Sequence, residues 1–276
     1  MIELNDDILR RVIKKRRAHS HKSDYGKLLL VGGNEQFGGA IILAASAAVY
    51  AGSGLTTVAC DLHNRSALHA RLPEAMVIDA HSDLKAAVLA ADVVVIGCGL
   101  GLSEESLEIF KEILKQITEN QFLVIDGSAI SLFARYGLEL PFPERTVFTP
   151  HEMELQRLSG LEIGGQNEAA VQAFANQIGA IIVAKSHQTR IFIPNQSAYL
   201  LTVGTPAQAT GGMGDTLAGL IGAFIGQFSS ALPEAVAAAV YLHSAIAHQL
   251  AEDAYVVLPS QIISEIPKWM KSHEDA

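Results

Sequence analysis

The feature of this sequence that most constrains its fold is an alternation of short apolar runs with longer helical patterns. Runs at Lys27–Val31, Leu55–Cys60 and residues 92–96 have the length and composition of buried strands. Helical patterns separate them, and Gly32-Gly33-Asn34 and Gly97-Cys98-Gly99-Leu100-Gly101 form glycine turns after two of the runs. Strands that alternate with helices build parallel sheets covered on both faces. The sequence therefore predicts an α/β protein with a mostly parallel central sheet.

The same alternation continues along the chain without a break. Further strand-like runs lie at residues 122–126, 146–148, 181–184, 190–193 and 198–201. The last two flank Pro194-Asn195-Gln196, which predicts a hairpin. Only helices are expected after the next glycine cluster, at residues 217–227, 233–252 and 261–270. No linker, low-complexity segment or repeat divides the chain, so we expect one domain over residues 1–276.

Polar and glycine residues follow several of the predicted strands. They are Gly33, Gly99, Asp126, His151 and Lys185. In open parallel sheets, ligands bind outside the carboxyl ends of the strands. These residues are therefore expected to meet at one edge of the sheet, which favours an enzyme over a structural protein.

The glycine cluster Gly211-Gly212-Met213-Gly214-Asp215 precedes an uncharged, helical run. A glycine loop that opens a helix offers free N–H groups and the positive end of the helix dipole to an anion. We expect Gly214 to take a positive φ there. Asp215 either accepts a proton from a hydroxyl that attacks a phosphate, or only caps the helix.

Composition narrows the partners. The net charge of -9 argues against a nucleic-acid surface, and 49% apolar residues indicate a well-filled core. The two cysteines, Cys60 and Cys98, are expected to be buried and reduced. The uncharged run at residues 37–60 predicts a helix followed by a strand and not a membrane span. The acidic N-terminus lacks the apolar core of a signal peptide, so we expect a cytoplasmic protein with no membrane partner.

An ordered set of motifs resembles the ADP/ATP-dependent NAD(P)H-hydrate dehydratases over nearly the whole chain. Gly-Gly-Met-Gly-Asp alone is shared with other ribokinase-like small-molecule kinases, whereas Ser20-His21-Lys22 and Thr149-Pro150-His151 narrow the resemblance. The remaining motifs are Ser23-Asp24-Tyr25-Gly26, Gly32-Gly33-Asn34, Gly38-Gly39-Ala40, Ala51-Gly52-Ser53-Gly54-Leu55, Ile96-Gly97-Cys98-Gly99-Leu100-Gly101, Ile125-Asp126, Glu152-Met153-Glu154 and Lys185.

The resemblance implies a ribokinase-like three-layer α/β/α sandwich without a separate lid domain. It implies repair of NADH and NADPH that have been hydrated at C6 of the nicotinamide ring, acting on the S-epimer. ADP, or ATP in some members, phosphorylates the C6 hydroxyl, and phosphate then leaves as the double bond returns. It further implies Mg²⁺, a homo-oligomer of tetramer type, and a separate epimerase encoded elsewhere, because this chain shows no epimerase-like segment.

The resemblance also assigns residues to roles. Asp215 matches the catalytic base, and Glu154 matches an acidic position with an indirect part in magnesium binding. Ala40, Gly99, His151 and Asp215 match the positions that hold the hydrated dinucleotide. The positions that hold ADP or ATP are matched by Lys185, Ser186, His187, Gln188, Thr189, Gly211, Gly212 and Gly214.

Three departures from the family pattern bear on binding. Residues 204–209 replace a Gly-Asn and Gly-Met pattern whose asparagine would contact substrate or nucleotide. Ser186 stands where glycine is usual, and Gly127-Ser128 follow Asp126 in place of a second acidic residue. We expect these changes to affect affinity or donor preference and to leave the catalytic loop intact.

Several structural interpretations stay open at this point. His151 can serve only as a helix cap, Lys185 as a solvated lysine, and Gly99 as a tight turn. Two other functions also remain: a kinase that releases a phosphorylated alcohol of the vitamin-precursor type, and a non-catalytic nucleotide-sensing module. The first alternative would use Asp215 in the same way, whereas the second predicts binding without turnover.

Overall fold

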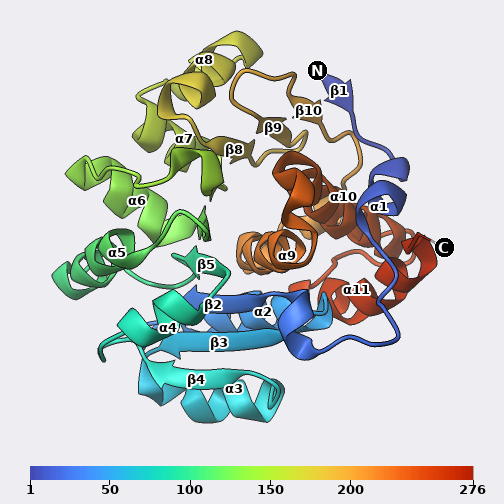
Figure 1. Cartoon of the computed structure of the whole chain (residues 1–276). Coiled ribbons are helices and arrows are strands. Elements are labelled where there is room, and N and C mark those ends of the chain that lie inside the picture. Colours follow the sequence, from blue (N-terminus) through green and yellow to red (C-terminus); the bar gives the residue numbers. More distant parts are fainter. Residues whose placement is uncertain (276) are drawn as a thin grey trace.

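The structure, a computed structural model, describes residues 1–275 as one twisted ten-stranded sheet flanked by helices (Figure 1). The strand order is β1-β10-β9-β8-β7-β6-β5-β2-β3-β4. The seven strands from β8 to β4 pair in parallel, whereas β9 runs antiparallel to both of its neighbours. The strands are β1 (Ile2–Glu3), β2 (Lys27–Val31), β3 (Leu55–Cys60), β4 (Met76–Asp79), β5 (Val93–Ile96), β6 (Phe122–Ile125), β7 (Thr146–Phe148), β8 (Ile181–Ala184), β9 (Arg190–Phe192) and β10 (Tyr199–Leu200). The predicted mostly parallel sheet and the β9–β10 hairpin are therefore confirmed.

Helices cover both faces of this sheet. The α-helices are α1 (Asp7–Val12), α2 (Gly38–Tyr50), α3 (Arg65–Arg71), α4 (Lys85–Ala90), α5 (Glu104–Gln116), α6 (Gly127–Tyr136), α7 (Glu152–Ser159), α8 (Glu168–Ile178), α9 (Met213–Phe228), α10 (Leu232–Leu250) and α11 (Pro259–His273). Figure 1 shows α4 to α8 on one side of the sheet and α2, α9, α10 and α11 on the other. Two separate buried clusters fill the two interfaces, as expected for a three-layer α/β/α sandwich.

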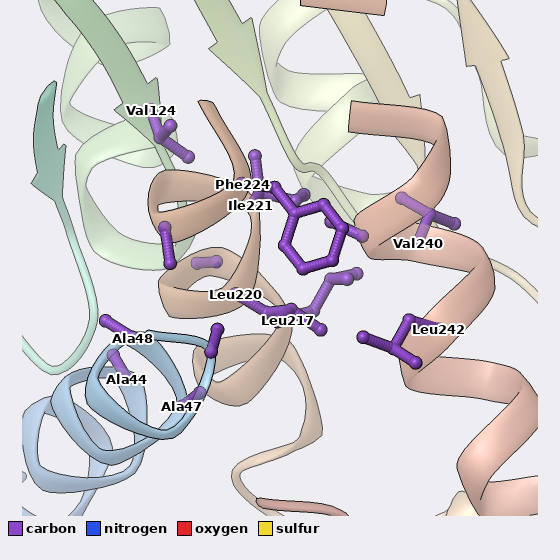
Figure 2. Close-up of a cluster of buried hydrophobic side chains, with 14 of the residues drawn as sticks. Ala44, Ala47, Ala48, Val124, Leu217, Leu220, Ile221, Phe224, Val240 and Leu242 are labelled. Atoms are coloured by element: carbon purple, nitrogen blue, oxygen red, sulfur yellow. The ribbon is translucent and has the colours of Figure 1, made fainter. Parts of the chain in front are cut away.

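The central helix pair α2 and α9 packs unusually closely. A Cβ placed on Gly219 of α9 would lie 2.0 Å from the backbone oxygen of Ala44 in α2. Figure 2 shows Ala44, Ala47 and Ala48 of α2 close to the apolar side chains of α9. Small residues therefore let the two backbones approach, and this contact accounts for the apolar character of both helices within a single subunit.

The stretch Met213–Leu250 is long and apolar enough to cross a membrane by length and composition alone. In the structure it consists of two helices, α9 and α10, separated by the short turn Ser229–Ala231. Both helices contribute fully buried residues to the same cluster, including Leu220, Phe224 and Val240 (Figure 2). They are core helices of this fold.

A crevice lined by Gly33, Asn34 and Leu100 lies at one edge of the sheet, in the loops after β2 and β5. From β2 the chain proceeds through β3 and β4 to one side, and from β5 it proceeds through β6, β7 and β8 to the other. The order therefore reverses between β2 and β5, and ligands bind outside the carboxyl ends of the strands at such a switch point. The Ser20-His21-Lys22 motif lies before β2, at the opposite edge, where Lys22 contacts Gly54 through its backbone.

Candidate active site

The loops after β2 and β5 are tied together at the switch point. Gly33 N–H donates to the Cys98 carbonyl at 2.9 Å, and Asn34 N–H donates to the Gly99 carbonyl at 2.8 Å. Gly99 has φ 65°, and a Cβ there would lie 2.4 Å from the Phe37 carbonyl and 3.0 Å from the Cβ of Ala40. Gly99 does make a tight turn, which brings it into contact with Ala40, and its part in binding stays a prediction.

The glycine loop opens α9 as expected, with one correction. Gly212 is the N-cap, with φ 92°, and Asp215 lies in the first turn without any side-chain cap hydrogen bond. The capping interpretation of Asp215 is therefore wrong. The expected positive φ at Gly214 is also wrong, because Gly214 is already within the helix and Gly212 makes the left-handed turn.

Lys185 is held by two carboxylates at the end of β8. Its Nζ lies 2.8 Å from Asp126 Oδ1 and 3.9 Å from Glu154 Oε2, and its side chain is 19% exposed. Burial alone would lower the pKa of Lys185, but Asp126 and Glu154 together raise it above its ordinary value. The solvated-lysine interpretation is therefore wrong. A Cβ on Gly214 would lie 3.1 Å from this ammonium, so Lys185 faces the first turn of α9.

Asp215 shares its surroundings with Asp126 and Cys98. One oxygen of each carboxylate and the Cys98 sulfur all lie within 4.8 Å of one another. Burial, and next the charge of Asp126, raise the pKa of Asp215 from 3.8 to about 6. Burial and the same two carboxylates raise the pKa of Cys98 well above its ordinary value, so its thiol stays protonated. A carboxylate with a pKa near neutrality is suited to accept a proton from a hydroxyl.

His151 caps α7, and its part in ligand binding stays a prediction. Its Nδ1 accepts from the N–H groups of Met153 at 3.1 Å and Glu154 at 3.4 Å. In return, Glu154 Oε2 accepts from the His151 N–H at 2.9 Å, which completes a capping box. The His151 side chain remains 52% exposed, so its imidazole is also open to a ligand at the sheet edge.

The residues offer Mg²⁺ a poor site of their own. Glu154 Oε2 is engaged by the His151 N–H and Lys185, and Oε1 lies 3.4 Å from His151 Nε2. The group of Cys98, Asp126 and Asp215 includes a protonated thiol, whereas Mg²⁺ prefers an octahedron of oxygen ligands. Direct ligation by Glu154 therefore does not fit, and only an indirect part through a bound phosphate remains for it.

The remaining residues assigned to the nucleotide form a loop beside Lys185. Lys185 N–H donates to the Pro150 carbonyl at 2.8 Å, and the Thr189 hydroxyl donates to the Ser186 carbonyl at 3.2 Å. A Cβ on Gly204 would lie 3.9 Å from the His187 carbonyl, so residues 204–209 adjoin this loop. That departing segment forms a capped 3₁₀ turn, in which the Thr205 hydroxyl accepts from the Ala207 N–H.

The structure brings most of the assigned residues to the carboxyl edge. Lys185, Glu154, Gly214 and Asp215 surround one buried centre, and Ala40 and Gly99 meet at the switch point. Sequence analysis did not assign a role to Asp126 or Cys98, although both follow strands at this edge. Their placement after β6 and β5 was the available signal.

Comparisons with known proteins agree with this geometry. The sequence model described as NAD(P)H-hydrate dehydratase matches residues 28–268. An ADP-dependent (S)-NAD(P)H-hydrate dehydratase of Lactococcus lactis subsp. lactis is 60% identical, over 99% of this chain and 100% of that protein. A crystal structure from Enterococcus faecalis, described as a ribokinase-like superfamily protein, superposes with a TM-score of 0.98 at 46% identity. The superposition covers 100% of this chain and 97% of the Enterococcus faecalis chain.

A second solved structure carries a nucleotide in its description. It is an ADP/ATP-dependent NAD(P)H-hydrate dehydratase from Bacillus subtilis co-crystallised with ATP and Mg²⁺. It superposes with a TM-score of 0.86 at 26% identity and covers 99% of both chains. The fold is therefore ribokinase-like, and the chain belongs to the NAD(P)H-hydrate dehydratase family of enzymes.

Proposed function

We propose that this enzyme restores NADH and NADPH from the S-epimers of their hydrates in an ADP-dependent reaction. The observation that carries the proposal is the placement of Asp215: a buried carboxylate with a pKa raised to about 6, in the first turn of α9. The helix N-terminus attracts phosphate, and the carboxylate can take a proton at neutral pH. The names of relatives at 45–60% identity support ADP as the donor.

In the proposed reaction, Asp215 accepts the proton of the C6 hydroxyl while the hydroxyl oxygen attacks the β-phosphorus of ADP. The bond from phosphorus to the bridging oxygen breaks, and AMP leaves. The lone pair of the ring nitrogen then expels phosphate from C6, and loss of a proton from C5 restores the ring double bond. Phosphorylation is needed because hydroxide is a poor leaving group. The N–H groups at the start of α9 would stabilise the transferring charge.

We assign the two ligands to opposite sides of Asp215. The nucleotide would lie on Lys185, the loop of residues 186–189, and the glycines Gly211, Gly212 and Gly214. Support comes from the Lys185 ammonium, which faces Gly214 and would offset phosphate charge. The hydrated nicotinamide would lie against Ala40, Gly99 and His151 in the switch-point crevice.

Mg²⁺ would accompany the phosphates of the nucleotide. Mg²⁺ in such sites is commonly held by substrate phosphates and water with few protein ligands. The engaged carboxylate of Glu154 is compatible with an indirect part only. When bound, the ion would neutralise phosphate charge.

We also propose that the whole chain, residues 1–276, is one domain that assembles as a homotetramer. Support comes from the segment between α10 and α11, where Tyr255, Val256 and Leu258 expose large apolar side chains. Sedimentation should show a species near four times the 29.4 kDa of one chain, and Tyr255→Ser should weaken it. A single-chain species at micromolar concentration would contradict the assembly.

The cellular setting follows from the chemistry. NADH and NADPH are intracellular metabolites, so we propose a cytoplasmic enzyme. An epimerase encoded elsewhere would supply the S-epimer from the R-epimer. The net charge of -9 gives no support to a nucleic-acid partner.

A product assay tests the function. The S-hydrate of NADH should yield NADH, AMP and phosphate in equal amounts when ADP is supplied. A stable phosphate ester would identify a kinase instead, and ADP binding without any product would identify a sensing module. Either result would overturn the proposal.

A further inference from the structure

We propose that Asp126 is a positioning residue of the phosphoryl-transfer centre, because it anchors the Lys185 ammonium beside Gly214 and places a second negative charge against Asp215. The inference rests on the proposed function only for the part of Asp215 as the base. The proposed reaction does not require Asp126 to contact the substrate.

The two oxygens of Asp126 face different groups. Oδ1 accepts from the Thr149 hydroxyl at 2.6 Å and from Lys185 Nζ at 2.8 Å. Oδ2 lies 3.8 Å from Cys98 Sγ and would lie 4.0 Å from a Cβ on Gly214. The side chain is only 4% exposed, so neither oxygen can turn to water. One oxygen therefore fixes the lysine while the other faces the site.

The carboxylate of Asp126 also brings a like charge close to Asp215. One carboxylate oxygen each of Asp126 and Asp215 and the sulfur of Cys98 all lie within 4.8 Å of one another in a buried centre. A carboxylate at this separation disfavours the ionised form of Asp215. Burial, and next the charge of Asp126, raise the pKa of Asp215, whereas Lys185 lowers it.

Among residues 1–275, the other titratable groups around this centre do not supply that charge. The Cys98 thiol from the loop after β5 stays protonated. Glu154 on α7 reaches the centre only through Lys185, at 3.9 Å. On α10, burial and the Lys185 charge lower the pKa of His243 to about 4, so its imidazole is neutral above that pH. Asp126 is thus the source of the negative charge that faces Asp215.

The pairing also explains how two carboxylates can lie beside a phosphate site. The Lys185 ammonium offsets Asp126, and it stays beside Gly214 because Asp126 and Glu154 hold it. Without Asp126, the lysine would lose its closest partner and the base would be weaker. Both effects should lower turnover more than they lower nucleotide affinity.

The decisive variant is Asp126→Asn, which keeps size and hydrogen bonding but removes the charge. The pH profile of turnover in the wild type should fall in acid with an apparent pKa of about 6. In Asp126→Asn this limb should move at least half a pH unit toward acid, while turnover at pH 8 falls roughly 3- to 30-fold. ADP affinity should stay within about threefold. An equal loss at every pH, with the limb unmoved, would show a purely structural role.

Thr149→Val is the matched control. It removes the other hydrogen bond to Asp126 Oδ1 but leaves the charge, so the acid limb should stay near its wild-type position. Asp126→Ser gives the same test if Asp126→Asn does not fold, because it also removes the charge. The acid limb should again move toward acid. A shift in the opposite direction would contradict the proposal.

A direct titration separates this inference from the proposed reaction. Carbon NMR of ¹³C-labelled aspartate can follow the Asp215 carboxyl, identified by its loss in Asp215→Asn, without any substrate. Its pKa should fall in Asp126→Asn whether or not the enzyme dehydrates NADH hydrates. An unchanged titration overturns the role of Asp126, whereas an absent dehydration with a shifted titration overturns only the proposed function.

Discussion

Asp215 lies in the first turn of α9, where burial and Asp126 raise its pKa from 3.8 to about 6. The folded chain therefore holds this proton more tightly than the unfolded chain does. Between about pH 4 and pH 6 the contribution of Asp215 to the free energy of unfolding decreases as pH rises, because the folded state retains more protons. Above about pH 6 the carboxylate is ionised in both states, and its unfavourable effect on the free energy of unfolding no longer changes with pH.

Replacement of Asp215 by asparagine should separate catalysis from stability. Asp215→Asn should lower turnover about 10²- to 10⁴-fold, because amide nitrogen and oxygen cannot accept the proton. It should raise the free energy of unfolding at pH 8 by about 1–3 kcal/mol, since a disfavoured charge is gone. The gain should vanish near pH 4.

Exposed Asp253 provides the control for this prediction, and Asp253→Asn should change neither quantity. Turnover of Asp215→Asn within a few-fold of the wild type would remove Asp215 as the base. Chemical denaturation at the two pH values measures the second part.

At the scale of elements, the strands were predicted better than the helices that follow them. Lys27–Val31 and Leu55–Cys60 were predicted to the residue, because central parallel strands are continuous apolar runs. The edge strands β1 and β4 and the helices α3, α4, α6 and α8 were missed. β4 is only partly buried, and α6 begins at Gly127, whose φ of 52° resembles a turn.

The candidate site was predicted in place but not in its connections. The position of Asp126 after a strand indicated the sheet edge, and this holds in the structure. Its pairing with Lys185, 59 residues away, depends on β6 and β8 lying on either side of β7. Spacing in the sequence carries no signal for that pairing, because it arises from the sheet order.

Helix α7 offers a test of whether His151 does more than cap. Asparagine caps helices well, so His151→Asn should keep the free energy of unfolding within about 0.5 kcal/mol of the wild type. If the imidazole binds the hydrated dinucleotide, the same variant should raise KM with little change in kcat. His151→Ala should lose the cap as well, about 1 kcal/mol. An unchanged KM in His151→Asn would leave His151 with its structural role alone.

The contact between α2 and α9 should be intolerant of any added atom. Gly219→Ala places a Cβ against the Ala44 carbonyl, which must push the two helices apart. We expect a loss of at least about 2 kcal/mol in the free energy of unfolding. Gly39→Ala is the control on α2, because a Cβ there meets no atom within 4 Å. It should change stability by less than about 1 kcal/mol, and an equal loss in both variants would contradict close packing as the cause.

At the scale of the whole molecule, the candidate site and one of the family motifs lie at opposite edges of the sheet. The carboxyl edge gathers Asp126, Glu154, Lys185 and Asp215, while the Ser20-His21-Lys22 motif lies at the opposite edge. Residues that identify the family are therefore not all residues of the site. The motif at the far edge instead forms a capping box, in which the His21 N–H donates to Asp24 at 2.8 Å.

The most direct test of the account is a reaction with the purified S-hydrate of NADH and ADP. The account predicts that NADH absorbance returns in the presence of the wild-type chain, with AMP and phosphate formed in equal amounts. Asp215→Asn should bind ADP yet restore NADH at least about 10²-fold more slowly. Failure of the wild-type chain to form NADH, while it binds both ligands, would contradict the account.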